Sequence, residues 1–275
     1  MQVGIERRVT LNSGVKMPWL GLGVYQSSAG QGTQKAVQAA FDYGYRLIDT
    51  ARIYGNEKDV RTAVRQSGLP RDEVFVTTKL WNSDHGYDST LRAFQESLRR
   101  LGLTYVDLYL IHWPQPGLRN ETWKAMIKLL KEGKTRSIGV SNYTIEHLKE
   151  LLRESDVVPD VNQVEFHPFL YQKDLLEFCQ QKKIQLEAYS PLTRGQRLDD
   201  PVIKSIATRH SRTPAQILIR WCLQHKVVAI PKSSRKERIL ENSKVFDFDL
   251  RPEEVRQLDS LSEDMRTNWD PTNVP

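Results

Sequence analysis

Short runs of apolar and β-branched residues recur along the chain, and each is followed by a stretch with helical spacing of its apolar residues. Such runs are typical of buried strands, whereas spacing by three and four residues is typical of helices that bury one side. The pattern predicts eight strands, at 20–25, 45–50, 74–80, 106–112, 137–141, 161–166, 185–189 and 227–231. It predicts helices at 33–43, 57–66, 89–101, 122–132, 145–154, 173–182, 201–210 and 235–244, with additional helices at 214–224 and 252–260.

Regular alternation of eight strands with helices in 275 residues predicts an α/β fold, a single (β/α)₈ TIM barrel spanning residues 1–275. The segment 9–17, with Asn12-Ser13-Gly14 in its middle, predicts an N-terminal β-hairpin outside the barrel. Thr213 before Pro214 is typical of a helix start, so the extra helices lie near the C-terminal end. An open doubly wound sheet is the alternative, but Gly21 and Gly23 lack the third glycine of its fingerprint.

The net charge of +6 raises the question of an anionic partner. The 40 Lys and Arg residues are dispersed, and stretches such as 146–154 and 232–244 contain both signs of charge. No basic stripe carries interleaved aromatic residues, which a nucleic-acid platform would require. Charge therefore favours a small phosphorylated ligand and no nucleic acid.

Cysteine and histidine usage gives no sign of a disulfide or a metal. Cys179 and Cys222 lie in apolar helical patterns, which predicts buried free thiols, and the six histidines show no paired metal-ligand spacing. Neither a signal-peptide core nor a long uncharged apolar run is present, so we expect no membrane association and a cytoplasmic location. The chain has no heptad run that would indicate a coiled-coil dimer, and we expect a monomer.

Polar residues end three neighbouring strands: Asp49, Lys79 and His112, with Tyr54 in the loop after the first of them. In a barrel these side chains converge at the carboxyl ends of the strands. An Asp–Lys pair alone is as readily a structural ion pair as a catalytic one. With a phenol beside it, the ammonium would lower the pKa of Tyr54 and make it a general acid near neutral pH. His112 could donate a hydrogen bond to a substrate oxygen, so the group suits protonation of an alkoxide formed from a carbonyl.

These residues also carry a family resemblance. Asp-Thr-Ala-Arg-Ile-Tyr at 49–54, Thr-Thr-Lys-Leu-Trp at 77–81 and Asp-Leu-Tyr-Leu-Ile-His-Trp-Pro at 107–114 resemble the aldo-keto reductases. Further matching motifs at 139–142, 162–165, 189–192 and 230–233 extend the resemblance over nearly the whole chain. The resemblance implies a barrel that uses NADPH, with Tyr54 as proton donor, Lys79 and Asp49 tuning it, and His112 orienting the carbonyl.

The resemblance also implies the cofactor site. Ser141, Asn142 and Gln163 would bind the nicotinamide carboxamide and Tyr189 would stack on the ring, although a tyrosine there is also an ordinary core aromatic. The remaining cofactor contacts fall on Gly23, Val24, Ser190, Pro191, Leu192, Lys232, Ser233, Arg238, Glu241 and Asn242. Lys232, Ser233 and Arg238 match the family's 2′-phosphate site, where charge-assisted contacts favour NADPH over NADH. Considered without the family resemblance, this stretch is a short solvated helix with mixed charges.

Tyr25, Trp81 and Trp113 neighbour the catalytic strand ends and, with His112, are expected to line an aromatic pocket mouth. The loop 114–121 and the C-terminal tail are short compared with longer relatives, which would remove material that closes the pocket. The layout resembles the microbial branch that reduces dicarbonyls such as methylglyoxal and diketo sugar acids. Two alternatives are a Schiff-base aldolase acting through Lys79, and a cofactor-binding regulatory module with little turnover.

Overall fold

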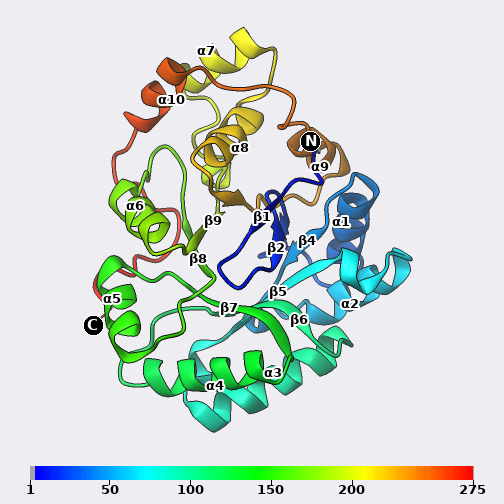
Figure 1. The fold of residues 1–275 in the computed structure, drawn as a ribbon. Helices are drawn as coiled ribbons and strands as arrows, with labels where there is room; N and C mark the ends of the chain where they lie inside the picture. The colour runs from blue at the N-terminus through cyan, green and yellow to red at the C-terminus, as the bar shows by residue number, and fades with distance from the viewer. Residues whose placement is uncertain (1–3, 275) are drawn as a thin grey trace.

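The computed structural model describes residues 4–274 and contains one eight-stranded parallel sheet in chain order (Figure 1). Its strands are β3 (Leu22–Gly23), β4 (Leu47–Asp49), β5 (Phe75–Leu80), β6 (Val106–Ile111), β7 (Thr135–Ser141), β8 (Val161–Glu165), β9 (Gln185–Tyr189) and β10 (Val228–Ala229). A parallel bridge between Leu20 and Ala229 joins the first and last strands, and Gly21 N–H donates to the Ala229 carbonyl at 2.9 Å. The sheet therefore closes, and the predicted (β/α)₈ barrel is confirmed.

A glycine is required where the barrel closes. A Cβ atom on Gly23 would lie 2.9 Å from the carbonyl oxygen of Ile230, closer than real Cβ contacts allow. The two backbones can approach each other at this seam because the residue has no side chain.

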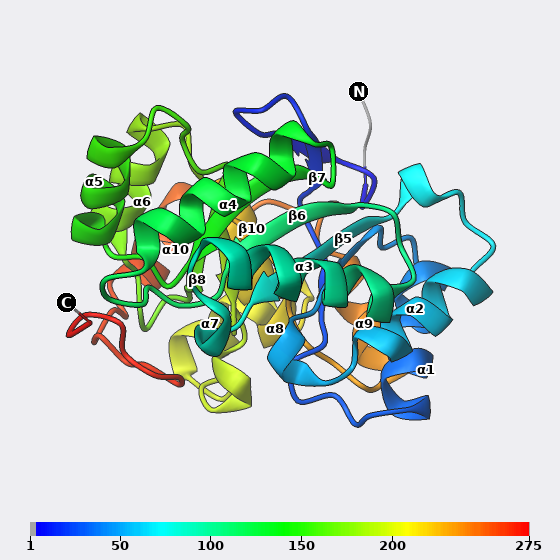
Figure 2. The same cartoon turned by 90° about the horizontal axis from the view of Figure 1, so that it is seen from below.

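Helices surround the sheet on its outer side, as Figure 2 shows from another direction. They are α1 (Gln31–Asp42), α2 (Glu57–Gln66), α3 (Tyr87–Leu101), α4 (Arg119–Lys131), α5 (Ile145–Glu154), α6 (Lys173–Gln181), α7 (Pro201–His210), α8 (Pro214–Gln224), α9 (Lys236–Ser243) and α10 (Pro252–Asp259). The predicted start of α8 is confirmed, because the Thr213 hydroxyl accepts a hydrogen bond from Gln216 N–H and Pro214 opens the helix. Helix α8 packs against β10, whereas α7 packs against α8 and α10 at the periphery.

The predicted hairpin is present as β1 (Arg8–Thr10) paired with β2 (Lys16–Pro18), and it lies across the centre of the barrel in Figure 1. Its Leu11 and Met17 are buried in the same apolar cluster as Leu47 and Phe75 of the barrel strands. The hairpin also receives support from β8, since Ser13 N–H donates to the Asp160 carboxylate at 2.9 Å just before that strand. The hairpin thus closes the amino end of the barrel, which leaves the carboxyl end for a site.

Three predicted strands are shorter in the structure, and the last of them, 227–231, contains regular structure only at Val228–Ala229. The expected strands 20–25 and 45–50 contain regular structure only at Leu22–Gly23 and Leu47–Asp49. Backbone pairing nevertheless continues, because Val24 N–H donates to the Asp49 carbonyl and Thr50 N–H to the Thr77 carbonyl, both at 3.0 Å. These first two strands end early because the chain turns outward there into the loops that carry Tyr25 and Tyr54.

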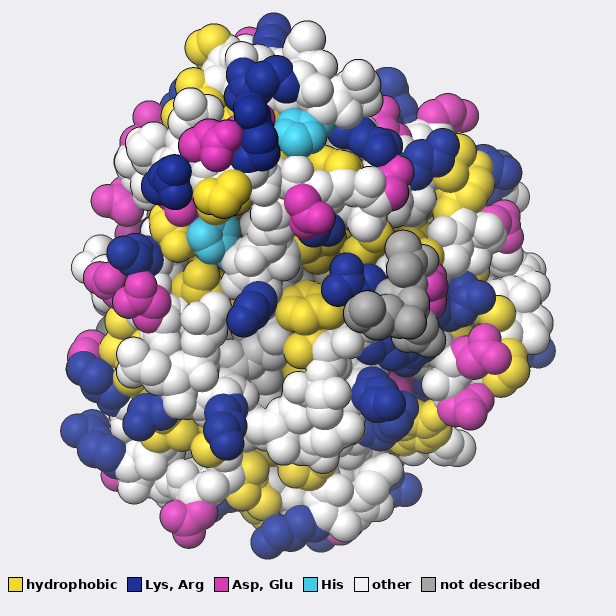
Figure 3. Space-filling view, turned by 45° about the horizontal axis from the view of Figure 1, so that its top comes forward, with side chains coloured by type: hydrophobic (Ala, Val, Ile, Leu, Met, Phe, Trp, Pro, Cys, Tyr) yellow, Lys and Arg dark blue, Asp and Glu magenta, His cyan; other side chains and the backbone are white. Residues whose placement is uncertain are grey.

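The surface shown in Figure 3 carries Lys and Arg side chains that are scattered rather than gathered in one stripe. Both cysteines are buried and free, as predicted. Among residues 4–274 no helix is long and apolar enough to cross a membrane. The same part of the chain contains no group of three or more His, Cys, Asp or Glu side chains that could hold a metal ion.

Candidate active site

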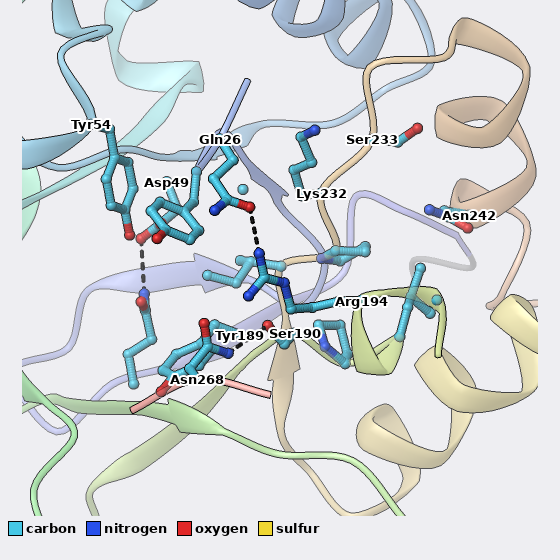
Figure 4. A pocket seen from close by; sticks show the side chains of 18 of the residues that line it. Gln26, Asp49, Tyr54, Tyr189, Ser190, Arg194, Lys232, Ser233, Asn242 and Asn268 are labelled. Carbon is cyan, nitrogen blue, oxygen red and sulfur yellow. Dashed lines mark hydrogen bonds between the residues drawn. The ribbon is translucent and has the colours of Figure 1, made fainter. Parts of the chain in front are cut away.

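A cavity of about 920 Å³ lies at the carboxyl end of the barrel. Figure 4 shows Tyr54 and Asp49 at one end of it, Ser233 and Asn242 at the other, and Arg194 between them. Of the site residues expected from the sequence, all but two line this cavity. The exceptions are Val24, which is fully buried and contributes its backbone to the barrel seam, and Lys79, which lies behind Asp49 and Tyr54.

The four residues expected to be catalytic come together as predicted from the strand ends. Asp49 ends β4, Lys79 lies near the end of β5, His112 follows β6, and Tyr54 ends a 3₁₀ turn at Arg52–Tyr54. Lys79 Nζ donates hydrogen bonds to Asp49 Oδ1 at 2.6 Å, to the Thr50 carbonyl at 3.1 Å and to Tyr54 Oη at 3.3 Å. Because Lys79 donates to the phenol oxygen, the Tyr54 proton remains free to be donated into the cavity.

Lys79 is poorly placed to be a nucleophile. Its three acceptors satisfy all three N–H bonds of the ammonium group, and the side chain is fully buried. A Schiff base would require a neutral amine that reaches the substrate. This geometry therefore disfavours the aldolase alternative.

The prediction that Lys79 lowers the pKa of Tyr54 is wrong for the free protein. Burial, followed by the nearby charge of Asp49, raises the pKa of Tyr54 well above its usual value. Asp49 lies 2.6 Å from the ammonium and offsets its positive charge, so the phenol experiences little net attraction for a negative charge. Tyr54 is consequently a protonated phenol at neutral pH, which is the form that a proton donor needs.

His112 is held neutral beside Tyr54. Burial and the Lys79 charge lower its pKa well below the usual value, and the two aromatic rings lie edge to face at 5.6 Å between centroids. A neutral imidazole carries one N–H and can donate a single hydrogen bond. The side chain lines the cavity, so this hydrogen bond is available to an oxygen placed next to the Tyr54 hydroxyl.

Three polar residues form a fixed wall next to this cluster. Tyr189 Oη donates to Asn142 Oδ1 at 2.7 Å, and Asn142 Nδ2 donates to the His112 carbonyl at 3.0 Å. Ser141 Oγ donates to the backbone carbonyl of Gln163 at 2.8 Å. Asn142 has a φ of 62°, a left-handed conformation that asparagine tolerates better than most residues. The wall is thus rigid before any ligand binds.

The opposite end of the cavity is basic. Lys232, Arg235 and Arg238 line it together with Ser233, and no carboxylate forms a salt bridge with any of these three cations in the part of the chain that the structure describes. Cations that face a cavity without partners are typical of a site for a phosphate group. Arg235 was not expected from the sequence, although it lies in the same mixed-charge stretch.

Sequence reasoning also missed contacts made by distant segments. Arg194 Nη2 donates to Gln26 Oε1 at 2.6 Å, which links the loops after β9 and β3 across the cavity (Figure 4). Nothing in the local sequence around either residue signals this pair, because 168 positions separate them. The only available hint was the position of both residues directly after barrel strands.

Although the C-terminal tail is short compared with longer relatives, Asn268 and Trp269 line the cavity. Trp269 packs on Trp113 with 4.6 Å between ring centroids, and Asn268 Nδ2 donates to Ser190 Oγ at 3.2 Å. The tail is anchored by the buried Glu165 carboxylate, which accepts hydrogen bonds from the backbone N–H groups of Thr267 and Asn268. In the sequence, the tryptophan at position 269 of an otherwise polar tail was the feature that could have indicated this contact.

The closed parallel barrel and the polar cluster at the carboxyl ends of its strands define the class of (β/α)₈-barrel enzymes. A model of the Aldo/keto reductase family matches residues 20–263, and the chain belongs to this family. It is 49% identical over 274 residues to the glyoxal reductase of Bacillus subtilis (100% of this chain, 99% of the relative). It is 52% identical over 268 residues to the 9,11-endoperoxide prostaglandin H2 reductase of Trypanosoma cruzi (96% and 95%). A Bombyx mori aldo-keto reductase solved in complex with NADP superimposes with a TM-score of 0.89 at 37% identity, covering 94% of each chain.

Proposed function

We propose that this aldo-keto reductase reduces aldehydes, dicarbonyls or ketones to alcohols, with NADPH as the hydride source and Tyr54 as the proton donor. The observation that carries the proposal is the hydrogen bond from Lys79 Nζ to Tyr54 Oη, which leaves the phenol proton directed away from the lysine in a cavity-lining residue. NADPH supplies the hydride when it is bound. The alkoxide that forms receives the Tyr54 proton, while the neutral His112 donates a hydrogen bond to the same oxygen.

The residues around the cavity fit NADPH. Ser141, Asn142, Gln163 and Tyr189 would hold the nicotinamide, while the three cavity-lining cations Lys232, Arg235 and Arg238 suit the 2′-phosphate of the adenosine. A dianionic phosphate among three cations is stabilised by charge-assisted hydrogen bonds, and NADH lacks that group. The solved relative with NADP supports this choice of cofactor.

For the substrate we propose small reactive carbonyls, including glyoxal and methylglyoxal, by analogy with the Bacillus subtilis glyoxal reductase. The aromatic side chains at the mouth, Tyr25, Trp81, Trp113 and Trp269, add apolar area that favours an aryl aldehyde as well.

A substrate screen tests this function directly. We expect NADPH absorbance to fall when methylglyoxal or a nitrobenzaldehyde is added to the purified protein, and to fall more slowly with ketosteroids and sugars. If the protein binds NADPH but none of the carbonyl compounds in the screen causes NADPH to be oxidised, the proposed activity would be rejected and the protein would instead be the regulatory module.

The cytoplasmic location and the monomeric state remain predictions from the sequence.

Weakening the tail anchor should affect larger substrates. Burial tends to raise the pKa of Glu165, but hydrogen bonds from His167 and Thr267 outweigh it and keep the pKa below its usual value. Glu165→Gln replaces these charge-assisted contacts with weaker neutral ones, so we expect the KM for an aryl aldehyde to rise about fivefold, with a smaller change for methylglyoxal. Steady-state kinetics measure both, with the exposed Glu177→Gln as a control. Equal KM values for the aryl aldehyde in Glu165→Gln and wild type would show that the tail does not shape the pocket.

A further inference from the structure

Strand β9 carries a buried carboxyl group to which the proposed reaction assigns no role. Glu187 lies in the middle of β9 and is fully buried inside the barrel. Its Oε2 accepts a hydrogen bond from Gln163 Nε2 at 2.8 Å, whereas its Oε1 has no hydrogen-bond partner among residues 4–274. Burying a carboxyl group with one oxygen unpaired costs free energy of folding, and an apolar residue would avoid that cost. A functional role would explain why a carboxyl group occupies this position.

The Gln163 amide lies between two carboxyl groups. Its Nε2 donates both to Asp49 Oδ2 and to Glu187 Oε2, each at 2.8 Å, so its two N–H bonds are used by one oxygen each. The reverse orientation would place the amide oxygen against the Asp49 carboxylate, which can only accept a hydrogen bond, and is therefore unfavourable. Gln163 lines the cavity, and no hydrogen bond from a described residue reaches its Oε1. The carbonyl oxygen is thus the atom that Gln163 offers to a ligand.

We propose that Glu187 is a positioning residue for the reduction: with Asp49 it fixes the Gln163 amide so that its carbonyl oxygen accepts a hydrogen bond from the nicotinamide carboxamide. The proposal rests on the proposed NADPH site. Asp49 alone would satisfy only one of the two amide N–H bonds and would leave the other unpaired in the barrel interior, where an unsatisfied donor is unfavourable. Glu187 supplies the acceptor for the second N–H bond, so both N–H bonds of the amide are paired in this orientation.

The surroundings of Glu187 favour its neutral form. The charged groups that face it are Asp49 on β4 and Lys79 on β5, while its neighbour on β10 is the apolar Val228. Burial and then the charge of Asp49 raise the pKa of Glu187 to about 8, and the Gln163 hydrogen bond and Lys79 offset only part of that rise. A neutral acid still accepts the hydrogen bond from Gln163 through its carbonyl oxygen.

The neutral form also benefits the proton donor. Burial is the main cause of the raised pKa of Tyr54, and a charged Glu187 raises that pKa further. An ionised Glu187 would therefore make Tyr54 a weaker acid. The buried acid thus orients the Gln163 amide without adding a second negative charge beside Asp49.

Two substitutions compare the loss of the acceptor oxygen with its retention. Glu187→Leu removes the acceptor, and we expect NADPH to bind about tenfold more weakly in a fluorescence titration, because the Gln163 amide is no longer held. Glu187→Gln retains an acceptor oxygen, and we expect its NADPH affinity to stay within about twofold of wild type. Asp160→Asn makes the same carboxyl-to-amide change at the other end of the barrel and should also bind normally.

The outcomes distinguish this proposal from the proposed function. Wild-type protein that binds no NADPH would overturn both, whereas wild-type NADPH affinity in Glu187→Leu would overturn the positioning role alone. A Glu187→Gln variant as weak as Glu187→Leu would also contradict it, since a retained acceptor should rescue binding.

A measurement without cofactor tests the neutral form. The unfolded chain releases the Glu187 proton near the ordinary glutamate pKa of about 4.3, while the folded chain keeps it until about pH 8. Folded wild-type protein therefore loses stability as the pH rises between these values, because its unfolded state binds fewer protons. Glu187→Gln lacks this loss, so the difference between its thermal unfolding midpoint and that of wild type should increase in favour of the variant from pH 5 to pH 8. A constant difference would show that Glu187 is ionised throughout.

Discussion

Tyr54→Phe is expected to lower kcat for carbonyl reduction about 1,000-fold, the usual size of a general-acid contribution. The phenylalanine keeps the aromatic ring at the mouth of the cavity but has no proton to give to the alkoxide. Lys79 retains its hydrogen bonds to Asp49 Oδ1 and to the Thr50 carbonyl, so the buried ammonium keeps most of its support. We therefore expect the fold and the Kd for NADPH to remain close to those of wild type.

A second tyrosine provides a matched control for this experiment. Tyr109 on β6 is also fully buried, its hydroxyl has no hydrogen-bond partner among the described residues, and its ring packs on Phe94 of α3. Tyr109→Phe removes the same atom on the outer side of the barrel wall, where it should leave kcat unchanged. If Tyr54→Phe reduced methylglyoxal at the wild-type rate, another group would have to be the proton donor.

The second large effect concerns the choice of coenzyme. The double variant Lys232→Met, Arg238→Met should weaken NADPH binding about 100-fold, roughly tenfold for each charge-assisted contact at an exposed site. Affinity for NADH should change little, because NADH has no 2′-phosphate for these side chains to bind. The preference for NADPH would fall by the same factor, which titrations with both coenzymes measure.

Raising the salt concentration should weaken NADPH binding to wild type more than to the double variant, because ions screen exposed charges. Lys236→Met is the control for the double variant, because it also removes a positive charge. Lys236 belongs to helix α9, as Arg238 does, but it lies over the Tyr43 ring rather than in the cavity. An unchanged ratio of NADPH to NADH affinity in the double variant would place the phosphate site elsewhere.

The barrel could be predicted from the sequence because buried parallel strands leave a strong signal. The strand β5, for example, is buried at every position, and such a run cannot be mistaken for a surface strand. The candidate site followed from the same pattern, since a parallel barrel gathers the ends of its strands at one face. Asp49, Lys79 and His112 are polar residues at the ends of apolar runs, and their meeting point is a consequence of topology.

Other parts of the site could not be predicted because they depend on contacts in space between residues far apart in the sequence, and not on the local pattern of apolar and polar residues. Glu187 alternates with apolar residues in β9, as a solvent-facing residue would, and only the closed barrel shows that it points inward. Trp269 meets Trp113 across 156 positions of sequence, which no local pattern reports. The direction of the Tyr54 pKa shift depended first on how deeply the phenol is buried and then on how closely Asp49 offsets Lys79, and neither can be read from a local pattern.

The burial of both cysteines has a consequence for an enzyme that handles electrophiles. Cysteine thiolates attack the electrophilic carbonyl carbons of reactive dicarbonyls, the substrates proposed above, so exposed thiolates would favour covalent inactivation. This chain has only two cysteines, Cys179 and Cys222, and neither is exposed. Burial raises the pKa of Cys179 to about 12 and also raises that of Cys222, so both stay as unreactive thiols. Under the proposed function, the two buried thiols are therefore poor targets for covalent modification by the substrate.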